Sequence, residues 1–480
     1  MKIFNKNKLL NLLFVVVMQM LHGCKIGELM PNQAFKTIPD SYLVGAQLDS
    51  NSVASNSWRN FFKDRDLIGL IDTALVHNQE FKIILQEIEI SKNEVRYRKG
   101  AYLPFLTLVL GSGIEKTPKY TRMGVLESEI NLPANKKNPE PMRDFQVGVE
   151  TKWELDIWGK LRNERRAANL RYLASIEGKN FMQTQLISEI AETYYELLAQ
   201  DNVYEILENN IKLQVDVLRI AKVQMANAKL NQLAVNRFEA QLLNMQNLQL
   251  EVKQKIIECE NHIHFLCGNY NEPITRNASQ FMASGIEKLD QGLPSQILLN
   301  RTDVKQAEQN LKASKLDVKA ARANFYPRFG LFSSIGFQTF NPLFLVHSES
   351  VLLRAVGDLV APLVNRSNIK AFYYSANARQ LQAAYNYQQS ILRAYVEVQN
   401  QYWKSVNYAK SFEVKNNEVN ILLQSVSIAN NLFLSARADY GEVLFTQREA
   451  LTAKMDLIEI KKNQLDAQVM LYKSLGGGWR

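Results

Sequence analysis

Four segments of the chain alternate hydrophobic and polar residues, and this period of two predicts β-strands with one apolar face. They lie at about residues 102–115, 143–155, 326–339 and 351–361, and the last has the weakest alternation. A sheet on a soluble core and a barrel in a membrane would both have this pattern, so alternation alone leaves both open.

Two much longer segments place hydrophobic residues at steps of three and four, which predicts α-helices with a coiled-coil seam. Runs that begin at Tyr204 and at Val419 follow this spacing. Helical character begins near Lys160 and near Asn368. Each helix would then have more than about 60 residues and a length of roughly 90 Å. A periplasmic or cytosolic coiled-coil scaffold would have the same periodicity.

The second half of the chain repeats features of the first half. Residues 101–113 and 324–336 align their prolines and their closing glycines. Residues 227–235 align with 435–443, where each long helix is expected to turn back into an antiparallel partner. These alignments predict a repeat of about 200 residues, much longer than the repeats of solenoid proteins.

The repeat gives a domain organisation. A first copy is expected at 64–280 and a second at 281–480, after an extended segment at 24–63. Each copy would contain a helix, two strands and a helical hairpin, with the hairpins at about 160–268 and 368–475. The expected fold class is therefore mixed, mainly α with a β-sheet, and with a two-fold internal repeat.

The N-terminus resembles a bacterial lipoprotein signal. Lys2, Lys6 and Lys8 precede an apolar stretch that ends at Leu21, and Cys24 follows three residues later. We therefore predict a signal peptide at 1–23 and acylation of Cys24. An ordinary signal peptide with a chance cysteine is the alternative. Lys25 differs from the acidic residue that retains lipoproteins in the inner membrane, which favours the outer membrane.

Composition and charge describe an ordinary folded protein. Hydrophobic residues make up 46% of the 480 residues and charged residues 22%, and the formal net charge is +9. Loss of the three lysines in 1–23 would lower this charge to +6. The basic residues are interspersed with acidic ones, which is typical of solvated helix faces and speaks against nucleic-acid binding.

Candidate chemistry is sparse. Cys259 and Cys267 lie eight residues apart on one predicted helix, too far apart to form a disulfide, and His262 and His264 between them face different sides. These residues predict no metal site. The glycines near the C-terminus lack the lysine and hydroxyl of a phosphate loop, and Asp156 has no evident basic partner. We expect no cofactor and no enzymatic activity.

Four strands are too few for a barrel that crosses a membrane, because the smallest such barrels have about eight and open edges are not tolerated in lipid. Several chains would have to combine their strands. A trimer would have 12 strands and a water-filled lumen. The polar positions of the strands would face that lumen: Gln146, Glu150, Lys152, Arg328, Gln338 and Arg354.

Several motifs along nearly the whole chain resemble one family. They are 58–62 (WRNFF), 153–160 (WELDIWGK), 292–295 (GLPS) with 301–304 (RTDV), 325–328 (FYPR), 361–366 (APLVNR) and 471–479 (LYKSLGGGW). Together they resemble the outer-membrane efflux proteins, the TolC-like channels, and specifically their lipoprotein branch of the NodT, OprM and CusC type. The chain departs from the family at Thr302, where proline is usual, and near Lys229, where a glycine is usual.

The resemblance implies a homotrimer whose 12-stranded barrel lies in the bacterial outer membrane and continues as an α-helical periplasmic tunnel. Such a channel exports small molecules passively, with a periplasmic adaptor protein and an inner-membrane pump of the resistance-nodulation-division type. A protein-secretion outlet and a lipid-anchored periplasmic scaffold are the alternatives. The exported substrate, a drug, a metal ion or another solute, stays open.

The resemblance also implies where the adaptor binds, which is at the two hairpin tips. Their residues are Asn227, Lys229, Leu230, Leu233, Val235, Ser435, Arg437, Asp439, Gly441 and Val443. A long tube of packed hairpins should constrict near these tips, and opening would be a rearrangement of helix pairs. Asn430 and Asn431 are the candidate gate residues.

Overall fold

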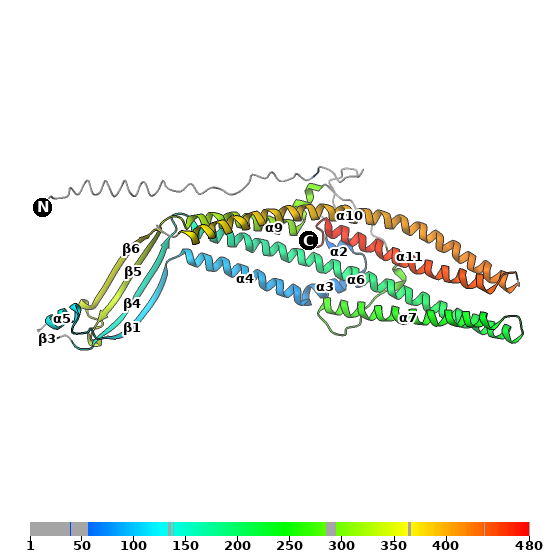
Figure 1. Cartoon of the computed structure of the whole chain (residues 1–480), viewed down its shortest axis with the longest axis horizontal. Coiled ribbons are helices and arrows are strands. Elements are labelled where there is room, and N and C mark those ends of the chain that lie inside the picture. Colours follow the sequence, from blue (N-terminus) through cyan, green and yellow to red (C-terminus); the bar gives the residue numbers. More distant parts are fainter. Residues whose placement is uncertain are drawn as a thin grey trace.

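The computed structural model of the chain describes residues 39, 56–132, 136–137, 139–284, 294–362, 366–435 and 437–479. A β-sheet stands at one end of this elongated molecule, helices run away from it, and two hairpin tips form the other end (Figure 1). The predicted signal peptide and Cys24 lie outside the described residues.

Two long helical hairpins form most of the molecule. In the first, α6 (Lys160–Ala226) turns back into α7 (Gln232–Cys267), and in the second, α10 (Ser367–Leu434) turns back into α11 (Tyr440–Ser474). The long helices have 67 and 68 residues. At about 1.5 Å per residue, each is roughly 100 Å long.

Shorter helices lie beside the long ones. Between the middle of the molecule and the sheet, α4 (Gln79–Tyr102) packs on α6, and α9 (Thr302–Ala323) packs on both α6 and α10 (Figure 1). Other short helices away from the sheet are α2 (Trp58–Phe61), α3 (Arg65–His77), α8 (Ile297–Asn300) and the 3-10 turns η3 (Ala278–Gln280) and η4 (Pro294–Gln296). No helix in the described part of the chain combines the length and hydropathy needed to cross a membrane.

The sheet has four antiparallel strands in the order β1-β4-β5-β6. Their bounds are β1 (Phe105–Glu115), β4 (Met142–Leu155), β5 (Arg328–Thr339) and β6 (Val351–Val360). The first and second halves of the chain therefore each contribute one hairpin, and the two hairpins join between β4 and β5.

The connection between β1 and β4 contains a short helix, α5 (Arg122–Glu129), and the small strands β2 (Asn131–Leu132) and β3 (Lys136–Lys137). Thr121 begins the helix because its hydroxyl accepts a hydrogen bond from the Gly124 amide at 3.2 Å. Two 3-10 turns, η5 (Pro342–Phe344) and η6 (Ser348–Ser350), lie in the loop between β5 and β6.

The main hydrophobic core lies in the middle of the molecule, where α2 and α3 pack on α6, α7 and α11. Phe61 stacks on Tyr472 with ring centroids 4.0 Å apart, and the Tyr472 hydroxyl donates to the Asn56 carbonyl at 2.7 Å. This contact explains two of the family motifs, 58–62 and 471–479, because it fastens one end of the described chain to the other.

The corner between sheet and helices joins the two halves. Trp158 stacks on Tyr326 at 4.8 Å and donates its indole N–H to the Pro327 carbonyl at 2.7 Å. Asp156 caps α6, since its carboxylate accepts from the Leu161 and Arg162 amides. The expectation that Asp156 lacks a basic partner is wrong, because the Arg162 side chain pairs with it at 3.1 Å.

The returning helices end in the same way in both halves. Gly268 and Gly476 both have positive φ angles, +67° and +91°, which glycine adopts at little cost. Each glycine lies against the start of a shorter helix: a Cβ on Gly268 would come within 2.5 Å of the His77 carbonyl oxygen, and one on Gly476 within 2.6 Å of the Asn300 carbonyl carbon.

Candidate functional site

One face of the sheet is apolar and exposed. Because directly paired residues of antiparallel strands share a face, the pairs Leu108 with Val149 and Ile335 with Leu353 extend this face over all four strands, through the further pair of Val149 with Ile335. The side chains are open to the surroundings: Leu108 is 66% exposed and Leu353 76%. A monomeric soluble protein rarely exposes an apolar surface of this extent.

The opposite face is mainly polar. Gln146 pairs with Gln338, and Glu150 pairs with Ser334, which in turn pairs with Arg354. By the same alternation, Lys152 and Arg328 lie on this face, so the register brings all six predicted lumen residues together on one side. Gln338 donates to both carboxylate oxygens of Asp144 at 3.0 Å.

The first hairpin tip is a compact turn. The Lys229 amide donates to the Gln224 carbonyl and the Ala228 amide to the Met225 carbonyl, both at 2.9 Å, which is the Schellman arrangement for ending a helix. Ala228 occupies the position where glycine is usual and has a φ of +53°. Asn231 then caps α7 by accepting from the Ala234 amide at 2.9 Å.

The second tip has a hydrogen bond that corresponds to the one between Lys229 and Gln224: the Arg437 amide donates to the Leu432 carbonyl, five residues earlier, at 2.9 Å. The two tips also touch each other, since Tyr440 of α11 packs on Phe238 of α7 with ring centroids 6.4 Å apart. Most of the predicted tip residues lie at the surface. Leu230 and Gly441 are half-buried. Val235 and Val443 are buried, at 2% and 3% exposed, so they support the tips from inside.

The candidate gate residues lie one turn before the second tip. Asn430 is half-buried and its side-chain oxygen lies 3.5 Å from the Gln447 amide nitrogen on α11, which makes this a weak hydrogen bond between the two helices of the hairpin. Asn431 is exposed, and its backbone carbonyl accepts from the Ser435 hydroxyl at 2.8 Å.

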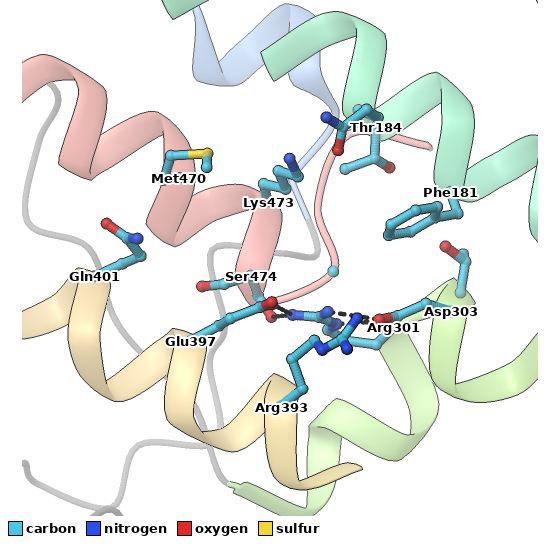
Figure 2. Close-up of a pocket in the computed structure, with 13 residues that line it drawn as sticks. Phe181, Thr184, Arg301, Asp303, Arg393, Glu397, Gln401, Met470, Lys473 and Ser474 are labelled. Atoms are coloured by element: carbon cyan, nitrogen blue, oxygen red, sulfur yellow. Dashed lines mark hydrogen bonds and ion pairs between the residues drawn. The ribbon is translucent and has the colours of Figure 1, made fainter. Parts of the chain in front are cut away.

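A buried arginine joins three helices where the second half of the chain meets the middle of the molecule (Figure 2). Arg301 is 6% exposed and forms a fork with Asp303 at 2.9 and 2.6 Å. It also donates to Glu397 of α10 at 2.6 Å and to the Ser474 carbonyl of α11 at 3.2 Å. Burial lowers the pKa of Arg301, but these acidic partners outweigh burial, so the net pKa is raised and the guanidinium stays charged.

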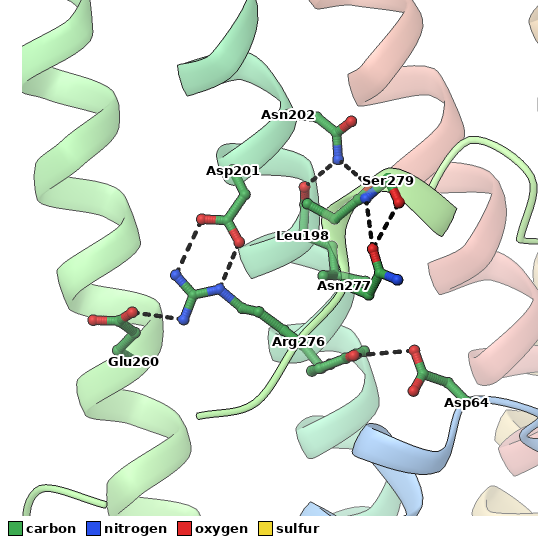
Figure 3. A network of polar contacts seen from close by, with 10 residues as sticks. Asp64, Leu198, Asp201, Asn202, Glu260, Arg276, Asn277 and Ser279 are labelled. Carbon is green, nitrogen blue, oxygen red and sulfur yellow. Dashed lines mark hydrogen bonds and ion pairs between the residues drawn. The ribbon is translucent and has the colours of Figure 1, made fainter. Parts of the chain in front are cut away.

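The first half has a comparable clamp at a different place (Figure 3). Arg276, on the segment that follows α7, donates to both carboxylate oxygens of Asp201 at 2.6 and 3.1 Å and to Glu260 at 2.7 Å. It thereby ties this segment to α6 and α7. Asn202 adds bonds to the carbonyls of Leu198 and Ala278.

Acidic and basic groups from α6 and α11 meet beside this region. Lys462 pairs with Glu196 at 2.9 Å and with Asp466 at 3.3 Å. Burial raises the pKa of Asp466 to about 7. The positive charge of Lys462 lowers this pKa and the negative charge of Glu192 raises it, but burial is the largest cause. The pKa of Glu192 is raised as well, and burial is again the main cause.

Metal-binding chemistry is absent from the described residues, where no cluster of three or more histidine, cysteine or acidic side chains could hold an ion. Cys259 and Cys267 are free thiols, and burial raises the pKa of each to about 11. They are therefore protonated and poorly reactive near neutral pH.

Sequence reasoning missed some residues of these sites. Arg276 gives no local signal, because its partners lie 75 and 16 residues away. Phe105 and Phe332 interrupt the polar face of the sheet, which only the strand register reveals.

Known proteins resemble this chain over most of its length. The solvent efflux pump outer membrane protein SrpC of Pseudomonas putida is 26% identical over 443 residues, which cover 92% of each chain. The probable outer membrane lipoprotein SilC of Salmonella typhimurium is 24% identical over 433 residues, 89% of each chain. A membrane protein of Pseudomonas aeruginosa of known crystal structure has the same fold, with a TM-score of 0.84 at 21% identity, over 94% of this chain and 100% of that one.

The model of a protein family described as outer membrane efflux protein matches residues 70–269 and 293–477. These two segments include both long hairpins, all four strands of the sheet and Arg301 with its partners. Arg276 lies between the two segments. The resemblance inferred from the sequence motifs is thereby confirmed: the chain belongs to the outer membrane efflux protein family.

Proposed function

We propose that this protein is the outer-membrane channel component of a tripartite efflux system, through which small molecules leave the cell passively. The observation that carries the proposal is the sheet, which exposes one continuous apolar face and one polar face and is joined directly to two helical hairpins. An apolar face of this extent fits acyl chains, and the polar face fits a water-filled lumen.

The active form in this proposal is a homotrimer. The strands β1 and β6 are the edges of the sheet, and open edges are not tolerated in lipid. Pairing β6 of one copy with β1 of the next in three copies would give a closed barrel of 12 strands. The hairpins would then continue the wall as a tunnel in the periplasm.

The proposal includes a two-fold repeat and a lipid anchor. One family model matches two segments of the chain, and the helices α7 and α11 end alike at Gly268 and Gly476. Both observations support two copies, at 64–280 and 281–480. The signal peptide at 1–23 and an acylated Cys24 are supported by the sequence pattern and by the likeness to SilC, a probable outer membrane lipoprotein.

A periplasmic adaptor would bind the exposed residues of the hairpin tips, and an inner-membrane pump of the resistance-nodulation-division type would supply the energy. Lys229, Leu233, Ser435, Arg437 and Asp439 are exposed and available for such contacts. Asn430 and Asn431 would belong to a gate that opens when the adaptor binds the open state better than the closed one. No part of this function calls for a catalytic group or a cofactor.

A matched pair of substitutions on β1 tests the proposal. Leu108 lies on the apolar face and Thr107, its neighbour, on the polar face. A lysine on the lipid face of a barrel costs about 2–4 kcal/mol near the bilayer midplane, and one facing the lumen costs much less. We expect Leu108→Lys to reduce the detergent-stable, heat-modifiable trimer extracted from outer membranes, whereas Thr107→Lys keeps both the trimer and its conductance in planar bilayers.

Two results would contradict the proposal. One is equal tolerance of both lysine substitutions. The other is a wild-type protein, correctly acylated, that stays monomeric in water without detergent and conducts no ions, which is what a periplasmic scaffold would do.

A further inference from the structure

A row that contains two phenylalanines crosses the mainly polar face of the sheet near its junction with the helices. Phe105 pairs with Lys152, Lys152 pairs with Phe332, and Phe332 pairs with Val356. These four residues therefore lie side by side on one face, one from each strand. This face carries most of the polar side chains of the four strands, and Phe105 and Phe332 are the two aromatic residues that these strands place on it.

The row borders an open groove rather than a packed core. A groove of 760 Å³ is lined by all four residues of the row. Phe105 is 64% exposed and Val356 43%, and Phe332 is half-buried. Arg354 places its guanidinium 5.8 Å from the centre of the Phe332 ring, which is a cation–π contact. The rings are therefore reachable from the polar side and held in a defined orientation.

Charges on both sides of the row are balanced. Three carboxylates and three cations lie on this face in the half of the sheet next to the helices: Glu150, Glu154, Asp358, Lys152, Arg328 and Arg354. Farther from the helices, Glu115 and Asp144 lie on the same face and bring its carboxylates in the four strands to five, so charge alone does not distinguish metal cations from organic cations. Cysteine and histidine, the usual ligands of soft metal ions, are absent from these four strands.

Aromatic rings and cations in an open groove suit one class of solute. Aromatic rings attract other rings by offset or edge-to-face stacking, worth about 0.5–1.5 kcal/mol for each pair. A hydrated metal ion has no ring that could stack in this way. We propose that the row Phe105, Lys152, Phe332 and Val356 is a contact site for the aromatic groups of exported organic molecules. The inference rests on the proposed channel function and adds a chemical class of exported solute, organic molecules with aromatic groups.

The test measures transient block of single channels in planar bilayers. The probes are benzyltrimethylammonium and tetramethylammonium, which have the same charge and differ by an aromatic ring. We expect benzyltrimethylammonium to block the wild-type channel for longer than tetramethylammonium. The double variant Phe105→Leu/Phe332→Leu keeps apolar side chains but loses both rings, so its block by benzyltrimethylammonium should be about 2- to 10-fold shorter.

Phe337→Leu is the matched control, because Phe337 lies on β5 but on the opposite, apolar face. Its block times should equal those of the wild type. Any of three results would overturn the inference. The two probes could block the wild-type channel for equal times, or benzyltrimethylammonium could block the double variant for as long as the wild type. In the third, Phe337→Leu would shorten the block as much as the double variant does. A wild-type protein without any conductance would overturn the channel function itself, so the two failures are distinguishable.

Discussion

Gly148 on β4 and Gly336 on β5 lie directly opposite each other at the centre of the sheet, where the two halves of the chain meet. A Cβ on Gly336 would come within 2.2 Å of the Val147 carbonyl oxygen and 2.4 Å of the Gly148 Cα. Both of these are backbone atoms, which cannot turn away as a side chain could. The junction of the two halves therefore depends on the absence of a side chain at this position.

We predict that Gly336→Ala destabilises the sheet by about 1–3 kcal/mol, the usual cost of forcing an extra group into a tightly packed site. Gly357→Ala on β6 is the control, because a Cβ there meets nothing within 4 Å. The stability of both variants is compared through the midpoint of thermal unfolding in detergent, which should fall for Gly336→Ala and stay near that of the wild type for Gly357→Ala. Equal midpoints for the two variants would show that β4 and β5 can separate enough to accept a methyl group.

A second prediction concerns Arg301, which holds α9, α10 and α11 together (Figure 2). Arg301→Lys keeps the positive charge but cannot make the two-pronged bond to Asp303 and reach Glu397 at once. We expect a loss of about 2 kcal/mol, typical of hydrogen bonds to charged groups. Arg301 and Arg393 of α10 line the same pocket, but Arg393 is exposed (Figure 2). Arg393→Lys should therefore change the unfolding midpoint very little.

A third prediction concerns pH. The folded-state pKa of Asp466 is raised from 3.8 to about 7 by burial. Between these values the folded protein holds a proton on this carboxyl that the unfolded chain has lost, so stability falls as pH rises from about 4 to about 7. One group can contribute a slope of up to about 1.4 kcal/mol per pH unit.

Asp466→Asn should therefore flatten the dependence of the unfolding midpoint on pH in this window. Asp456→Asn is the matched control on the same helix, because Asp456 is half exposed and paired with Lys415 at 3.0 Å. It should leave the slope in place. If the midpoint of Asp466→Asn still fell with pH as in the wild type, the pH dependence would come from another carboxylate, and Glu192 is the first candidate.

The sequence predicts those parts of the fold that depend on local pattern. Alternation at Val147 and Val149 assigns the faces of β4 because side chains in any strand alternate, and the register extends that assignment across the sheet. The long helices follow from steps of three and four without a proline or glycine between Thr184 and Met225. The motif at 301–304 can be recognised in the sequence, but the contacts that Arg301 makes with other helices cannot.

The remaining features depend on contacts between distant residues. Arg301 meets Glu397 across 96 residues and Ser474 across 173, and nothing near Arg301 identifies either partner. The row of Phe105 and Phe332 requires the register of three strands, because a one-residue shift would move one ring to the other face. Helix α5 is a short helix in a loop, and its Thr121 cap is a weak signal by itself.

The last prediction concerns Ala228 at the first hairpin tip, where the sequence lacks the glycine that is usual near Lys229. The chain still forms the turn, with a φ of +53° at Ala228. A left-handed conformation costs a residue with a Cβ about 1–2 kcal/mol, and part of this is regained because alanine restricts the unfolded chain more than glycine does. Ala228→Gly should therefore stabilise the tip by about 0.5–1 kcal/mol.

Hydrogen exchange measures this effect locally. The Lys229 amide donates to the Gln224 carbonyl across the turn, so its exchange should slow by about 2- to 5-fold in Ala228→Gly. Ala226→Gly is the control with the opposite sign, because Ala226 is the last residue of α6 and glycine is less favourable within a helix. Faster exchange in both variants would mean that flexibility of the tip, rather than the strain at Ala228, controls how often the turn opens.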